Sequence, residues 1–130
     1  MKNIYLGSAI SVALVIFLSS FSLNTANIEG DDTFVIPDNI NKTLQKSCYG
    51  CHNSESKNMK GKMKLKLDEF PTMKKSKLIS KLSKISKTLG KDKMPPKKFL
   101  SHYPEKALSS DEKAALMDWA KSTATKLAEE

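Results

Sequence analysis

The stretch Cys48-Tyr49-Gly50-Cys51-His52 contains both cysteines of the chain and one of its two histidines. Two thiols separated by two residues can form thioethers with the two vinyl groups of one haem, and the next residue then lies beneath the iron. An imidazole nitrogen at that position can bind the metal. The motif therefore predicts one covalently attached haem (haem c), with Cys48 and Cys51 as attachment points and His52 as the proximal iron ligand.

Three other interpretations use the same residues. A redox-active dithiol also has the Cys-x-x-Cys spacing, but it is expected in a strand–helix unit of thioredoxin type, and the sequence indicates no such strand. A structural zinc site needs four ligands, and beyond this motif only His102 and acidic residues remain. A disulfide staple or a pair of buried thiols leaves His52 unexplained. Covalent haem accounts for all three residues.

A second iron ligand is offered by Met94, within Lys93-Met94-Pro95-Pro96. The prolines stiffen the segment that presents the thioether, and thioether sulfur favours ferrous iron and raises the reduction potential. Met94 is therefore the predicted distal ligand, although it could instead fill a gap in the core. The other side chains that could bind the iron are those of Met59, Met63, Met73, Met117 and His102.

The length and composition indicate one small domain that depends on a bound group. A chain of 130 residues excludes a large multidomain enzyme. The first 26 residues hold 16 apolar residues, and the remaining 104 hold 35. A domain with so few apolar residues needs a further stabilising group to complete its core. A disulfide between two cysteines three positions apart would add little to the stability.

The N-terminus carries an uncharged run at residues 4–23, IYLGSAISVALVIFLSSFSL, behind Lys2. This pattern predicts an export signal or a membrane anchor. Ala26 offers a cleavage site, but Asn24 stands where a small residue is preferred, so a cleaved signal and a retained anchor both remain open. The predicted organisation is a signal or anchor at residues 1–26, a linker at 27–37 and a haem domain at 38–130. That domain is expected on the outer side of the cytoplasmic membrane, in the periplasm, soluble or anchored.

Helical spacing of apolar residues predicts two long helices. One contains Leu78, Leu82, Ile85 and Leu89 and ends at Gly90. The other begins after Ser109, a predicted N-cap with a glutamate three positions on, and runs nearly to the C-terminus. Its expected apolar stripe consists of Leu116, Trp119, Ala120, Thr123 and Leu127.

Two further segments are less regular. Asp38 is the expected N-cap of an earlier helix. Between His52 and Phe70 the apolar residues Met63, Leu65 and Leu67 alternate with lysines as in a strand. Because no partner strand is evident elsewhere, an extended loop is expected there.

The chain from about Ile36 to Ala120 resembles the small haem-binding domain of bacterial exported monohaem c-type cytochromes. In that family Cys-x-x-Cys-His is followed by Met-Pro-Pro and then by a helix ending in Leu-x-x-Trp. The corresponding stretches here are Cys48 to His52, Met94-Pro95-Pro96, His102-Tyr103-Pro104 and Leu116-Met117-Asp118-Trp119. The resemblance implies an all-α, cytochrome c-like fold in which the N- and C-terminal helices cross beside the haem and the methionine loop covers its other side.

The sequence departs from this family after the haem motif. Residues 53–66, NSESKNMKGKMKLK, contain neither aromatic residues nor prolines. In ordinary cytochromes a downstream proline carbonyl often accepts a hydrogen bond from the second nitrogen of the proximal histidine. No proline lies between His52 and Pro71, so the sequence leaves open which group orients His52.

The positive charge is concentrated in one part of the chain. All 22 basic residues are lysines, the formal net charge is +8, and residues 42–98 carry 17 lysines against four acidic residues. Such a region could bind an acidic redox partner, the haem propionates or anionic lipid beside an anchor, or could simply be a solvated face. Nucleic acid is not expected for an exported protein.

These features predict a one-electron carrier, not an enzyme. The sequence places no general acid or base beside the distal side except His102, which keeps an alternative open. That alternative is a haem-based sensor or peroxidase with a weak or open sixth iron position.

Overall fold

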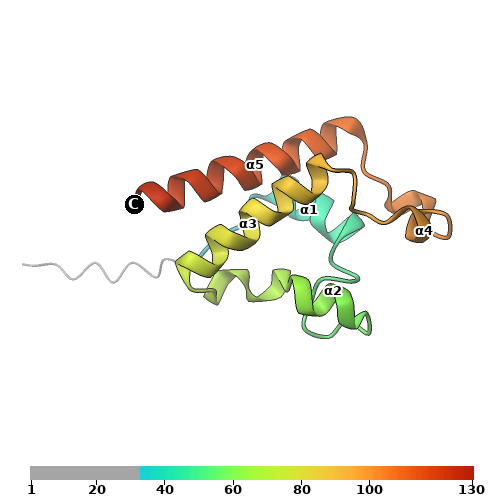
Figure 1. The fold of residues 1–130 in the computed structure, drawn as a ribbon, viewed down its shortest axis with the longest axis horizontal. Helices are drawn as coiled ribbons and strands as arrows, with labels where there is room; N and C mark the ends of the chain where they lie inside the picture. The colour runs from blue at the N-terminus through green and yellow to red at the C-terminus, as the bar shows by residue number, and fades with distance from the viewer. Residues whose placement is uncertain (1–32) are drawn as a thin grey trace, which may run out of the picture. The chain divides into compact units, whose positions relative to one another are not determined.

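The computed structural model describes residues 33–130 (Figure 1), and the predicted export signal or anchor lies outside these residues. The longest helix, α5 (Ser110–Glu129), begins where the sequence predicts. The Ser109 hydroxyl accepts a hydrogen bond from the Glu112 amide (3.1 Å), and the Glu112 carboxylate accepts one from the Ser109 amide (2.8 Å). This capping box fixes the start of α5 by satisfying two amides that the helix itself leaves unpaired.

The core forms where α3 (Lys75–Gly90) runs alongside α5 (Figure 1) in the most extensive helix–helix contact of the described residues. The predicted apolar face of α3 is largely confirmed, because Leu78, Leu82 and Leu89 are buried while Ile85 is half-buried. From α5, Leu116, Ala120 and Ala124 are buried, whereas Trp119, Thr123 and Leu127 are half-buried.

Helix α1 (Asp38–Ser47) closes one side of this core. It buries Ile40 and Leu44 and contacts α5. Asp38 is its first residue, and Pro37 occupies the N-cap position without a side-chain cap, so the expected Asp38 cap is wrong by one residue. Proline suits the start of a helix because its missing amide is not needed there.

The prediction of an extended loop between His52 and Phe70 is wrong. This stretch contains α2 (Met59–Lys64) and the 3₁₀ helix η1 (Leu67–Thr72). The Asn58 side chain caps α2 by accepting a hydrogen bond from the Gly61 amide at 2.9 Å. Helix α2 buries none of its residues, and its two apolar side chains, Met59 and Met63, are too few to predict a helix from the sequence.

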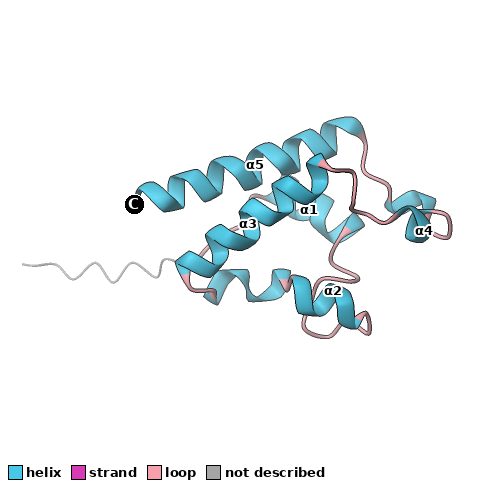
Figure 2. Cartoon of the chain, viewed as in Figure 1, coloured by secondary structure: helices cyan, strands magenta, loops and turns pink. Residues whose placement is uncertain are grey.

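The remaining elements are the short helix α4 (Lys97–Leu100) and the 3₁₀ helix η2 (Pro104–Lys106). Every regular element in residues 33–130 is therefore helical (Figure 2), which confirms the all-α fold class. None of the helices in this part of the chain is long and apolar enough to cross a membrane.

An ion pair couples the start of α5 to α1 and makes stability depend on pH. The Lys46 ammonium donates to both Glu112 oxygens at 2.7 and 2.6 Å. This hydrogen bond, assisted by the amide of Ser109, lowers the pKa of Glu112. A carboxyl whose folded-state pKa is depressed contributes stability above its unfolded pKa and loses it as pH falls through the folded one.

We therefore expect the free energy of unfolding to fall as pH is lowered from about 5 to about 3, and to fall less steeply in Glu112→Gln. Denaturant titrations followed by circular dichroism at several pH values measure both slopes. Glu129→Gln is the matched control, because Glu129 forms no ion pair among residues 33–130. Parallel pH profiles for wild type and Glu112→Gln would contradict the expectation.

Candidate functional site

One cavity of about 400 Å³ gathers the four side chains that the sequence predicts for a haem site. Cys48 is the C-cap residue of α1, and Cys51 and His52 follow in the turn after it. Met94 comes from the segment that leads into α4, and helix α2 forms another part of the wall. The complete lining consists of Ser47, Cys48, Cys51, His52, Asn58, Lys60, Gly61, Lys64, Met94, Pro95, Pro96 and Phe99.

The donor set of this cavity fits a haem. Its volume falls within the range of about 300–1,000 Å³ that is usual for ligand pockets. Two thiols, an imidazole and a thioether are the groups by which proteins attach haem and bind its iron. No disulfide joins the two cysteines. Burial, and to a smaller extent the neighbouring Cys51, raises the pKa of the Cys48 thiol to about 11.

A backbone carbonyl of α2 orients His52. Its Nδ1 lies 2.9 Å from the carbonyl oxygen of Gly61. Because a carbonyl can only accept, Nδ1 must carry the proton, which leaves the lone pair of the imidazole on Nε2. Such a bond fixes the ring and makes the other nitrogen a better metal ligand. Gly61 thus provides the acceptor for which the sequence offers no proline.

The close approach of α2 to the motif requires glycine at position 61. A Cβ there would overlap the carbonyl oxygen of Cys51 and would lie 3.0 Å from the carbonyl carbon of that residue. The Gly61 carbonyl also accepts a hydrogen bond from the Leu65 amide at 3.0 Å. The same oxygen therefore stabilises the last turn of α2 and orients His52. Sequence reasoning missed Gly61. A glycine inside a six-residue helix is the one available signal, since glycine disfavours helix interiors.

Hydrogen bonds from polar side chains shape the loop between the motif and α2. The buried Ser56 hydroxyl donates to the Gly50 carbonyl at 3.0 Å and accepts the Asn58 amide at 3.1 Å. The carboxylate of Asp68 accepts the Ser54 amide, with both oxygens 3.1 Å away. These contacts hold the loop in the absence of prolines and aromatic residues.

Among the candidates for the second iron ligand, only Met94 lines the cavity. Met59 and Met63 are exposed on α2, and Met73 and Met117 pack against the core. His102 is an exposed residue beyond α4 and does not line the cavity either. Met94 lies between α3 and α4, outside both helices.

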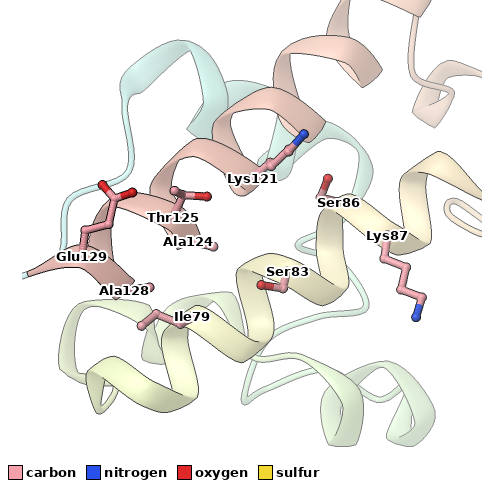
Figure 3. Close-up of a pocket in the computed structure, with 9 residues that line it drawn as sticks. All are labelled: Ile79, Ser83, Ser86, Lys87, Lys121, Ala124, Thr125, Ala128 and Glu129. Atoms are coloured by element: carbon pink, nitrogen blue, oxygen red, sulfur yellow. The ribbon is translucent and has the colours of Figure 1, made fainter.

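A second hollow, of about 550 Å³, lies between α3 and α5 (Figure 3). Its lining residues include Ile79, Ser83, Lys121 and Ala124, and none of them is a cysteine, histidine or methionine. This hollow therefore lacks the side chains that attach haem or bind its iron.

Comparison with known protein families identifies the cofactor that the domain binds. Residues 57–122 match the model of the haem-binding domain family. The chain belongs to this family. This haem-binding domain protein is thus a haem protein, and the all-α expectation drawn from the resemblance agrees with its fold. The matched region includes α2 and Met94 but begins after Cys48, Cys51 and His52, whose roles remain predictions. Searches of curated proteins and of solved structures found no match.

Proposed function

We propose that this protein is an exported monohaem c-type cytochrome that carries single electrons on the outer side of the cytoplasmic membrane. In this proposal Cys48 and Cys51 attach the haem, His52 binds the iron and Met94 is the distal ligand. The observation that carries the proposal is the 2.9 Å contact between His52 Nδ1 and the Gly61 carbonyl, made at the cavity that the two cysteines and Met94 also line.

Each side chain would have a distinct task. Two thioethers from Cys48 and Cys51 would hold the porphyrin when the protein opens or unfolds. His52, oriented by Gly61, would present Nε2 to the iron. Met94 would favour the ferrous state and so raise the reduction potential. The haem would supply the reversible one-electron couple, for which the chain needs no general acid or base.

The proposal is tested by visible spectra of the exported protein, prepared from a host that matures c-type cytochromes. Spectra of the oxidised and reduced protein are recorded before and after denaturation. Covalent attachment predicts that haem stays on the denatured chain, and methionine ligation predicts the weak far-red band of sulfur-bound ferric haem. Haem that separates from the denatured chain would overturn covalent attachment, and a chain that takes up no haem would overturn the cytochrome assignment.

The position of Met94 favours a second candidate function, a haem-based sensor or peroxidase. Met94 lies between α3 and α4, outside both helices, so its thioether could leave the iron and open the sixth position to an external ligand. Carbon monoxide distinguishes the two functions. Ready binding to the ferrous protein would favour the sensor or peroxidase, whereas resistance to binding would favour the carrier.

For Met94→Ala we expect the haem to stay attached, the far-red band to vanish and the reduction potential to fall by on the order of 100 mV, because axial ligands tune haem potentials over a wide range. Redox titration and carbon monoxide binding measure these changes. Met73→Ala is the control, since Met73 is a half-buried methionine that does not line the cavity. An unchanged spectrum in Met94→Ala would assign the sixth position to another ligand.

A further inference from the structure

Helix α2 exposes apolar side chains instead of burying them. Met59 and Met63 are 61% and 73% exposed, and no residue of α2 is buried. Residues four apart lie on the same side of a helix, so the two thioether side chains form one small apolar patch. Methionine adapts to different surfaces and is frequent where proteins dock.

Lysines surround this patch. Residues 57–64 contain Lys57, Lys60, Lys62 and Lys64 and no acidic residue. None of these four lysines forms an ion pair within residues 33–130. Because successive residues of a helix are rotated by about 100°, Lys60 and Lys62 lie on opposite sides of the methionines. The surface thus has an apolar centre and a positive rim, and we name it the α2 patch.

The α2 patch adjoins the candidate haem site through the same short helix. Lys60, Gly61 and Lys64 line the cavity, and the Gly61 carbonyl contacts His52. A protein seated on the α2 patch would therefore lie next to the wall that orients the proximal ligand. Electron transfer benefits from such closeness between the docking surface and the cofactor.

We propose that the α2 patch is the docking surface for an acidic protein that exchanges single electrons with the haem. The inference rests on the proposed electron-carrier function and adds the place and chemistry of docking. When bound, the haem would supply the one-electron couple: its iron would lose one electron on becoming ferric, and the oxidised metal centre of the partner would gain that electron. Charge complementarity defines the partner, because residues 57–64 carry four lysines and no acidic residue.

The dimensions of the patch favour a protein over a lipid surface. Helices that lie in a membrane interface present a long, continuous apolar face opposite a charged one. Helix α2 has six residues and only two apolar side chains. A protein partner needs less apolar area at this point, because its acidic rim can meet the lysines around the methionines.

The test measures electron transfer from the reduced holoprotein to an acidic blue-copper protein by stopped-flow absorbance at low and high salt. The first variant is Lys57→Glu/Lys62→Glu, since neither lysine lines the cavity. We expect its rate at low salt to fall by about tenfold, with most of the salt dependence lost. The control is Lys121→Glu/Lys126→Glu on α5, which has the same net charge and is expected to change the rate by less than about twofold.

A second variant, Met59→Ser/Met63→Ser, tests the contribution of the apolar centre to docking while keeping all the lysines. Its rate is expected to fall severalfold while the salt dependence remains. Equal losses in the two lysine variants, or wild-type rates in both α2 variants, would overturn the docking proposal. Binding to phosphatidylglycerol vesicles that is lost in the α2 variants while their rates are unchanged would replace the protein partner with a lipid surface.

The spectrum and reduction potential of each variant distinguish the failure of docking from the failure of the proposed function. If the α2 variants have wild-type spectra and unchanged transfer rates, the docking proposal is wrong and the electron-carrier proposal is unaffected. A wild-type chain without covalent haem would instead overturn both.

Discussion

Cys48→Ala/Cys51→Ala is expected to lose all covalently attached haem, so that the pigment separates from the chain on denaturation. Each single variant keeps one thiol and is expected to retain a reduced yield bound through one thioether. The physical reason is that in the proposed site His52 and Met94 would bind only the iron, and these bonds would break when the chain unfolds. Haem-stained denaturing gels and the absorbance of acid-denatured protein measure the attachment.

The matched control is Met94→Ala, which changes a side chain of the same cavity but keeps both thiols. Its denatured chain should remain coloured. Haem that stays on the denatured double cysteine variant would contradict covalent attachment through the motif. The double variant should also unfold at lower denaturant concentration. Covalent attachment keeps the haem at a high effective concentration beside the cavity of about 400 Å³, whereas unattached haem is diluted into the solution when the chain unfolds.

The long helices could be predicted because their signals are local. Ser109 and its partner Glu112 mark the start of α5 in the sequence, and the same two residues form the capping box in the structure. In α3 the leucines at positions 78 and 82 lie one turn apart and are buried against α5. The apolar spacing in the sequence matches the buried residues of the structure because each helix buries one face against its neighbours.

The helix α2 could not be predicted because contacts with residues outside the helix stabilise it. Its cap, Asn58, is followed by lysines and only two apolar residues, and the helix buries none of its side chains. What holds it in place comes from outside: His52 donates to the Gly61 carbonyl, and the Lys81 ammonium donates to the Lys64 carbonyl. Tertiary contacts of this kind leave no periodic trace in the sequence.

The candidate site likewise contains residues that the sequence predicts and one residue that it does not predict. The sequence names Cys48, Cys51, His52 and Met94 because their residue types and order carry the chemistry. It does not name Gly61, because a backbone carbonyl can come from any residue. The need for glycine arises only from the overlap that a Cβ would have with the Cys51 carbonyl oxygen.

Gly61→Ala is therefore expected to destabilise the protein, although alanine is the better helix former. Alanine would gain about 1 kcal/mol of helix propensity at an unconstrained site. Here its Cβ meets backbone atoms of Cys51, which cannot rotate away as a side chain can. Overpacking of this kind costs roughly 1–3 kcal/mol, so a net loss of about 1 kcal/mol is expected from denaturant titration.

The same variant should change the haem, because α2 must move away from the motif to make room. Such a shift would weaken the hydrogen bond from His52 Nδ1 to the carbonyl of residue 61, make the imidazole a poorer electron donor and raise the reduction potential. Gly50→Ala, within the motif, meets no atom within 4 Å, and Gly90→Ala on α3 meets only the flexible end of Met117. Both controls should keep the wild-type potential. A Gly61→Ala protein with wild-type stability and potential would mean that the carbonyl of residue 61 does not position His52.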